Sequence, residues 1–257
     1  MADDLHTEIF LGVPIHIAGE NAIVDLATKW ISGRKRPSAI IVQTNVFSLV
    51  SAAEDPNYRA ILCEANLSLP DGMPLVWFLR RKGHSGSTRN YGPDLMLALC
   101  KKAAQSGWRC FFYGGEPGVS ELLRTKLSDR YPGLNVVGVL SPPFRELTTV
   151  EEEEACLVIN KSRPDILWVS LGGPKQDTWM YNHRMNLDVS VMHGVGAAFD
   201  FHSGRKPQAP RWMMNLGFEW VFRLMTEPRR LWKRYTLVNA KFLRLVFLEL
   251  LRKGHQP

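Results

Sequence analysis

Short apolar runs alternate with amphipathic stretches along most of the chain. Runs rich in Val, Ile, Leu and Phe predict buried strands, and stretches with apolar residues every three or four positions predict helices. Strands that are apolar throughout are typical of a parallel sheet with helices on both faces. The pattern therefore predicts an α/β fold with a Rossmann-like, mostly parallel sheet flanked by helices. The predicted strands span residues 9–15, 39–44, 66–70, 109–115, 135–140, 165–173 and 188–196, and the predicted helices span residues 21–31, 45–55, 93–107, 117–133 and 148–162.

The pattern changes near residue 204, where the strand signals stop. A Pro-containing stretch leads into two predicted helices over residues 213–227 and 229–253, separated at Pro228. In the second helix apolar residues recur every three or four positions, and basic residues occupy the other faces. The sequence thus predicts two units, an α/β domain over residues 1–203 and a basic, amphipathic helical appendage over residues 204–257.

Charge separates the two units more sharply than composition does. The chain has 257 residues, 45% of them hydrophobic and 22% charged, which excludes a disordered chain, a fibre and a multi-spanning membrane protein. Residues 204–257 hold twelve basic and three acidic residues, a formal charge of +9 against −2 for the rest. An anionic membrane surface is the partner that a basic amphipathic helix with aromatic residues predicts. The alternative, which does not exclude the first, is a helix whose apolar stripe packs on the body.

The N-terminus lacks the apolar run of a signal peptide, and no stretch reaches 18 apolar residues. We therefore expect a cytoplasmic protein whose membrane contact is peripheral.

The chain lacks the sequence motifs of several kinds of enzyme and binding protein. No dinucleotide fingerprint, Walker A motif, nucleophile elbow or D-x-D pair is present, so neither a bound cofactor nor a metal is expected. The body also lacks a basic groove and any helix-turn-helix, finger or RNP signature, so nucleic acid is not an expected partner. Self-association is left open. The cysteines are far apart and lie among apolar residues, which predicts small buried side chains at Cys63, Cys100, Cys110 and Cys156.

Polar or glycine-rich turns follow five of the predicted strands. In parallel sheets ligands bind beyond the carboxyl ends of the strands, and glycines let backbone N–H groups approach a phosphate. The turns therefore predict an anionic, nucleotide-like ligand at one edge of the sheet. The residues concerned are Gln43, Thr44, Asn45, Asp71, Gly114, Gly115, Gly172, Lys175, Gln176, Gly194 and Gly196.

Asp71 stands between Pro70 and Gly72 just after a predicted strand. A carboxylate in this position can accept a proton from a substrate hydroxyl, and it can equally serve as an Asx-turn or helix cap. A diphosphate bound without a metal would need arginines, because guanidinium groups bind phosphate through two N–H groups. The basic appendage supplies Arg211, Arg223, Arg230 and Arg234 among aromatic residues.

These residues stand in a longer series of phrases: LPDGMPLVW, RNYGPDLM, FFYGGEPGVSELL, LWVSLGGPKQDTWM and EWVFRLMTEPRR, in this order. The series resembles the WecG/TagA/CpsF family of enzymes, glycosyltransferase family 26, over roughly residues 9–245. The resemblance implies inverting, metal-independent transfer of a hexose-type sugar, as N-acetylmannosamine or a glucose-type sugar, from a UDP-sugar donor. It also implies a polyprenyl-diphosphate-linked sugar as acceptor, at the inner face of the cell membrane.

The resemblance also assigns residues. It implies that Asp71 is the catalytic base and that Asn45, Arg89 and Gln176 belong to the site. It implies that Arg223, Arg230 and Arg234 close over the donor diphosphate. The chain departs from the family pattern at Gln43, where many members have threonine, and at Gln208, where many have arginine, so the donor sugar stays open. A nucleotide-binding scaffold tethered by its basic tail and a Rossmann-type oxidoreductase are the alternative functions, the second disfavoured by the missing dinucleotide motif.

Overall fold

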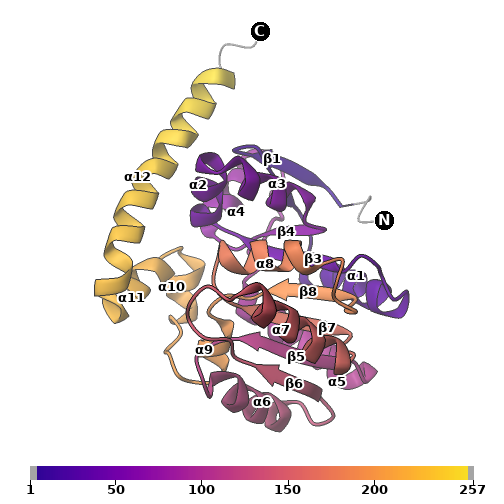
Figure 1. The fold of residues 1–257 in the computed structure, drawn as a ribbon. Helices are drawn as coiled ribbons and strands as arrows, with labels where there is room; N and C mark the ends of the chain where they lie inside the picture. Colours follow the sequence, from indigo (N-terminus) through magenta and orange to yellow (C-terminus); the bar gives the residue numbers. More distant parts are fainter. Residues whose placement is uncertain (1–4, 254–257) are drawn as a thin grey trace.

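The centre of the molecule is a six-stranded sheet in which all neighbouring strands run parallel (Figure 1). The computed structural model describes residues 5–253, and within them all side chains except those of residues 230, 234, 252 and 253. The strands lie in the order β4-β3-β8-β7-β5-β6, so the predicted parallel α/β architecture is confirmed. Their bounds are β3 (Ala39–Thr44), β4 (Leu67–Pro70), β5 (Arg109–Gly114), β6 (Asn135–Leu140), β7 (Ile166–Ser170) and β8 (Val191–Gly194).

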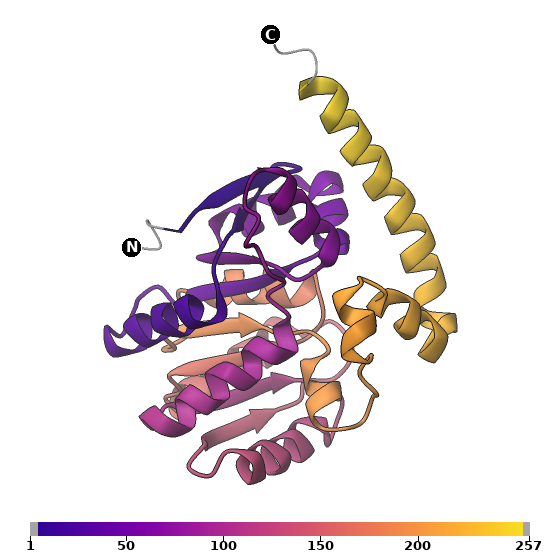
Figure 2. The ribbon, with the colours of Figure 1, turned by 180° about the vertical axis from the view of Figure 1, so that it is seen from behind.

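Helices cover both faces of this sheet, which explains why the strands are apolar throughout. The two helix layers can be followed in the opposite views of Figures 1 and 2. One face packs against α1 (Glu20–Ser32), α5 (Gly92–Ser106), α6 (Val119–Arg130) and α9 (Ala198–His202). The other packs against α2 (Val46–Glu54), α3 (Pro56–Glu64), α4 (Met73–Arg81), α7 (Thr149–Lys161) and α8 (Lys175–His183).

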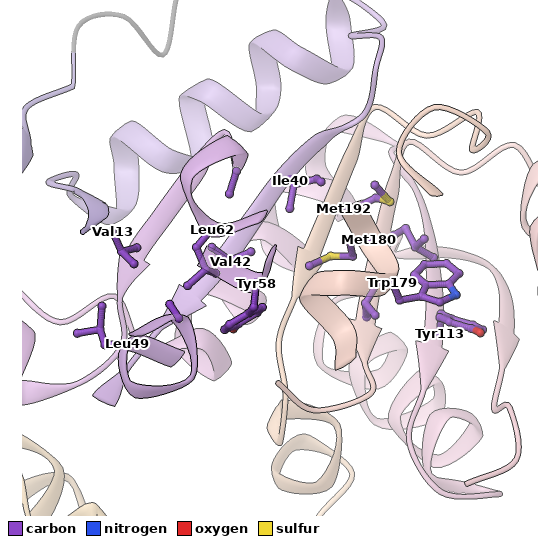
Figure 3. Close-up of a cluster of buried hydrophobic side chains, with 14 of the residues drawn as sticks. Val13, Ile40, Val42, Leu49, Tyr58, Leu62, Tyr113, Trp179, Met180 and Met192 are labelled. Carbon is purple, nitrogen blue, oxygen red and sulfur yellow. The ribbon is translucent and has the colours of Figure 1, made fainter. Parts of the chain in front are cut away.

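Successive residues of a central strand enter different cores. Ile40 and Val42 of β3 belong to the cluster on the α2 and α8 face, whereas Ile41 belongs to the cluster on the α5 face. Figure 3 shows the first of these clusters, with Leu49 and Tyr58 among its members. Each fully buried aliphatic or aromatic side chain stabilises the fold by about 1.5–3 kcal/mol. The two cores therefore fix the sheet edge on which the candidate site is built.

The prediction of a single N-terminal strand over residues 9–15 is wrong in detail. The segment is an antiparallel hairpin outside the main sheet, formed by β1 (Thr7–Phe10) and β2 (Val13–His16). Leu11 and Gly12 turn the chain with φ of 51° and 79°, the left-handed conformation that a two-residue hairpin turn requires. Helices α3, α4 and α9 were not predicted either. The prediction for the cysteines holds for Cys100, Cys110 and Cys156 and is wrong for Cys63, which is exposed.

The C-terminal segment, residues 204–253 of the described chain, contains three helices, α10 (Arg211–Asn215), α11 (Glu219–Thr226) and α12 (Pro228–Lys253). The helix predicted over residues 213–227 is interrupted at Gly217, whose φ is 80° and whose position lies against Met73 and Trp77 of α4. A separate appendage beginning at residue 204 stays a prediction.

Helix α12 packs on the body beside α2 with one of its faces (Figure 1). Phe242 is buried and meets the ring of Phe10 edge-on at 5.9 Å between centroids. Lys241 pairs with Glu54, and Glu249 accepts a hydrogen bond from the backbone of Leu11. Docking on the body, which the sequence left open, is therefore what α12 does with this face.

Candidate active site

The predicted turns meet at one edge of the sheet, because the carboxyl ends of parallel strands share an edge. Strands β3 and β4 end side by side there, and Asp71 continues their pairing by donating its backbone N–H to the carbonyl of Thr44 over 2.8 Å. Asp71 is thereby fixed immediately beyond β4. Its side chain is 19% exposed, so the carboxylate is mostly buried but can be reached from solvent.

Arg89 holds Asp71 from the loop before α5. Its Nε donates to the Asp71 carbonyl oxygen over 3.1 Å, and its Nη2 lies 3.3 Å from Asp71 Oδ1. The same Nη2 lies 2.7 Å from Oε2 of Glu219, the first residue of α11. Tyr91 lies under the guanidinium, 4.2 Å from ring centroid to Cζ, and its hydroxyl donates to Glu219 Oε1 over 3.3 Å. One arginine therefore joins two carboxylates that come from distant parts of the chain.

Burial raises the pKa of Asp71 to about 6. The guanidinium of Arg89 opposes that rise in pKa, the negative charge of Glu219 adds to it, and the Gly92 backbone N–H and the Arg223 cation oppose it. A carboxylate whose pKa is near 6 is ionised at neutral pH and still has appreciable proton affinity, as a general base requires. The alternative role of Asp71 as a helix cap is wrong, because the N-cap of α4 is Gly72 and no described side chain caps it.

The three polar residues at the end of β3 have different surroundings. Asn45 caps α2, accepting from the backbone of Phe47 and Ser48 at 3.0 and 3.2 Å, so the N-terminus of that helix lies at the sheet edge beside Gly72. Thr44 is fully buried, and its hydroxyl contacts Ser68 at 2.6 Å. Thr44 therefore reaches the site through its backbone carbonyl rather than its side chain.

Gln43 lies deeper, below the edge. Its Nε2 is 2.8 Å from Nε2 of His193 on β8, and burial lowers the pKa of that histidine to about 3, which keeps it neutral. The side chain also lies against Gly92, where a Cβ would come within 3.2 Å of Gln43 Cγ. Gln43 Oε1 is buried without a hydrogen-bond partner among the described residues, so one polar atom beneath the edge remains available.

The glycines of the turns fall into two groups. A Cβ at Gly114 would lie 2.3 Å from the Ser170 carbonyl oxygen, one at Gly115 would press on Phe199, and one at Gly194 would strike Met180 and Gln176, so packing accounts for these three positions. At Gly172 and Gly196 φ is 76° and 53°, and a Cβ would meet no described atom within 4 Å. Gly172 is exposed and Gly196 is half-buried, so the second group leaves space beside the backbone at the edge, as close approach of a ligand requires.

The P-K-Q phrase begins α8. Gln176 is buried, and its Oε1 accepts from the backbone N–H of Gly196 over 3.1 Å, which ties the β7 and β8 turns together. Lys175 is exposed and donates to the carbonyl oxygen of Arg145 over 3.0 Å. Gln176 thus shapes the edge of the sheet, whereas the side chain of Lys175 is engaged by the backbone of Arg145.

The arginines of the C-terminal segment are only partly gathered at Asp71. Arg223 on α11 is half-buried, with its guanidinium 5.8 Å from the ring centroid of Phe201, and it acts electrostatically on Asp71. Arg211 instead pairs with Asp94 on α5, with one N–O distance of 2.9 Å. The side chains of Arg230 and Arg234 lie outside the described residues, so their predicted role stays a prediction.

The described residues show no cluster of three or more His, Cys, Asp or Glu side chains that could hold a metal ion. Across the same residues, none of the helices combines the length and apolar character needed to cross a bilayer.

Comparison with known proteins gives one family over almost the whole chain. Residues 8–256 match the family described as "Glycosyl transferase WecG/TagA/CpsF family". The chain belongs to this family. It is 28% identical over 253 residues, 98% of this chain and 96% of the relative, to the N-acetylglucosaminyldiphosphoundecaprenol N-acetyl-beta-D-mannosaminyltransferase of Bacillus subtilis (strain 168). It is 31% identical over 209 residues, 81% of this chain and 78% of the relative, to the enzyme of the same name from Bacillus spizizenii (strain ATCC 23059 / NRRL B-14472 / W23). The protein is thus a glycosyltransferase.

Sequence reasoning missed two groups in this glycosyltransferase. Glu219 is one of three acidic residues in a strongly basic segment and stands between Phe218 and Trp220, a local signal that it is buried and paired. Asp177 is buried next to Gln176 and accepts from the Tyr58 hydroxyl over 2.7 Å, and burial raises its pKa to about 6. No local signal reveals the Tyr58 contact, because the two residues are 119 positions apart.

Proposed function

We propose that this glycosyltransferase moves a hexose-type sugar from a UDP-sugar to a polyprenyl-diphosphate-linked sugar with inversion at the anomeric carbon. The donor is UDP-N-acetylmannosamine or a glucose-type UDP-sugar. The names of the two Bacillus relatives, which include both an N-acetylmannosaminyl group and a diphosphoundecaprenol, support this substrate class. The observation that carries the proposal is the mostly buried Asp71 carboxylate, held beside Arg89 at the carboxyl edge of the sheet.

In the proposed reaction the acceptor hydroxyl gives its proton to Asp71. Its oxygen forms a bond to the anomeric carbon from the face opposite the diphosphate, and the bond from that carbon to the diphosphate oxygen breaks. UDP then departs with the bonding electrons and gains negative charge. Arg223, Arg230 and Arg234 stabilise that charge, aided by backbone N–H groups near Gly172. Losing one such preorganised donor typically costs about 10²–10³ in rate.

The acceptor's lipid also requires contact with a membrane. We propose that the C-terminal segment rests on the inner face of the cell membrane, as a peripheral attachment. The support is a set of large apolar side chains left exposed beside the basic residues Arg229, Lys233 and Arg244, a composition that binds anionic lipid surfaces. The exposed apolar residues of the segment are Trp212, Leu216, Phe218, Trp220, Met225, Trp232, Leu237, Leu243, Phe247, Leu248, Leu250 and Leu251, and Trp77 of α4 is exposed as well.

Turnover by the Asp71→Asn variant tests the catalytic assignment. UDP-N-acetylmannosamine, UDP-glucose, UDP-N-acetylglucosamine and UDP-glucuronate would each be offered with a short-chain polyprenyl-diphosphate sugar, with UDP release and product anomer measured with and without chelator. We expect one donor to give an inverted product, and Asp71→Asn to lose turnover while keeping UDP affinity. Asp25→Asn, exposed on α1, is the matched control. A tenth of wild-type activity in Asp71→Asn would refute the base, and nucleotide binding without turnover of any donor would favour a scaffold.

Cosedimentation with vesicles tests the membrane contact. Wild-type protein is expected to bind vesicles containing phosphatidylglycerol and to release them at high salt. Replacement of Leu243 and Phe247 by Ser should weaken binding, whereas replacement of the exposed Leu157 on α7 should not. Equal binding by all three proteins would refute the proposed contact.

A further inference from the structure

Glu219 is a mostly buried acid in the most basic part of the chain. Its side chain is 12% exposed, and it begins α11, where it reaches across to the loop that precedes α5. Its Oε2 lies 0.6 Å closer to Arg89 Nη2 than Asp71 Oδ1 does, at 2.7 Å against 3.3 Å. The guanidinium is therefore shared, and Glu219 has the shorter contact.

Arg89 is anchored independently of this shared contact. The Nε of Arg89 donates a hydrogen bond to the backbone carbonyl oxygen of Asp71, and its guanidinium stacks on the ring of Tyr91. Loss of the Glu219 charge would thus leave Arg89 in place, with its Nη2 free to shorten the 3.3 Å hydrogen bond that it already donates to Asp71 Oδ1. An aspartate paired with one arginine typically has its pKa lowered by about 1–3 units, and a carboxylate with a lower pKa is a weaker base.

We infer that Glu219 is a positioning residue, which holds Arg89 between two carboxylates and so keeps Asp71 able to accept the acceptor's proton. This inference rests on the proposed role of Asp71 as base. The groups that act on Asp71 from the elements around it are Arg89, Glu219, Arg223 and the Gly92 backbone N–H. Two of the four, Glu219 and Arg223, belong to α11, and Arg89 contacts the first of them, so the base works fully only while α11 is docked.

The test is the acid limb of the pH–rate profile in Glu219→Gln, measured as kcat and KM separately. The midpoint of this acid limb is expected to fall by one pH unit or more. We expect kcat at pH 8 to fall while the KM for the donor stays within twofold of wild type. A carbon-13 NMR pH titration of the aspartate carboxyl groups follows the ionisation of Asp71 directly, without catalysis. The Asp71 signal is assigned by its absence in Asp71→Asn. Glu227→Gln is the matched control, because Glu227 is the other acid near α11 and pairs with Lys206 rather than Arg89.

The two readouts separate the inference from the proposed function. A shift of the Asp71 titration without a shift of the rate profile supports the positioning role and refutes Asp71 as the base. An Asp71 titration unchanged in Glu219→Gln overturns the inference. If Glu219→Gln does not fold, Glu219→Asp keeps the charge but draws it back by one methylene, and it should give a smaller shift in the same direction; no shift there also overturns the inference.

Discussion

Asp71 is expected to cost the protein stability at the pH at which it works. Burial raises its pKa from 3.8 to about 6. The folded protein thus binds the Asp71 proton more tightly than the unfolded chain does. This bound proton stabilises the folded state fully below about pH 4, and that stabilisation is lost as pH rises through 6. At 1.36 kcal/mol for each pH unit, the ionised carboxylate costs about 3 kcal/mol at pH 8.

Asp71→Asn removes that cost, because an amide has nearly the same shape and does not ionise. Arg89 keeps a carboxylate partner in Glu219, so the substitution leaves no unpaired buried cation. The variant is therefore expected to be more stable than wild type at pH 8, by about 1–3 kcal/mol. Because part of the cost is already present at pH 5, this advantage should shrink by about 1 kcal/mol between pH 8 and pH 5.

Urea unfolding of both proteins at pH 5 and pH 8 measures this difference directly. Asp177, whose pKa is also raised to about 6, is present in both proteins and cancels in the comparison. Asp25→Asn, at an exposed position on α1, is the control for the removal of a negative charge. The reasoning fails if Asp71→Asn is less stable than wild type at pH 8, or if its advantage is the same at both pH values.

Three further predictions concern stability. Gly114→Ala should cost more than 2 kcal/mol in urea unfolding, because its Cβ would lie 2.3 Å from the Ser170 carbonyl oxygen, whereas Gly172→Ala, in open space at a φ of 76°, should cost about 1 kcal/mol. Phe242→Ala should cost about 3 kcal/mol through lost packing of α12, seen as a lower urea midpoint. Burial lowers the pKa of His193 to about 3, so the unfolded chain takes up a proton below pH 6.5 that the folded protein refuses. Between pH 7 and pH 5 the wild type should therefore lose stability relative to His193→Gln, in which this contribution is absent.

The sheet was predictable because its evidence is local. Each central strand is a short apolar run followed by a helical pattern, and these two periods identify parallel α/β units without any knowledge of distant contacts. The N-terminal hairpin was not predictable from the same signal, since its turn at Leu11-Gly12 interrupts an apolar run without any polar residue. The break at Gly217 was likewise not predicted: this residue has a left-handed φ of 80° and lies against Met73 and Trp77 of α4, which are far away in the sequence.

In the candidate site too, the residues with a local sequence signal were predicted and those defined by distant contacts were not. Asp71 was identified because the strand end, Pro70 and Gly72 mark it locally. Arg89 entered only through the family resemblance. Glu219 was missed although its aromatic neighbours mark it as buried, because a partner 130 positions away leaves no periodic trace. The resemblance gives residue types in order along the chain, but the sharing of one guanidinium by two acids is a distance relation that only coordinates contain.

The way the C-terminal segment meets the body near the site explains why this sharing matters. The buried apolar contact there is small, with Tyr91, Ala209 and Met214 at its centre. Ion pairs of Glu219 with Arg89, and of Arg211 with Asp94, also link α11 and α10 to the body. Pairs of this kind are weaker than a packed core and are screened by salt when exposed. The charges around Asp71 are therefore contributed both by the loop before α5 and by α11, and the proposed catalytic base depends on the ion pair that joins them.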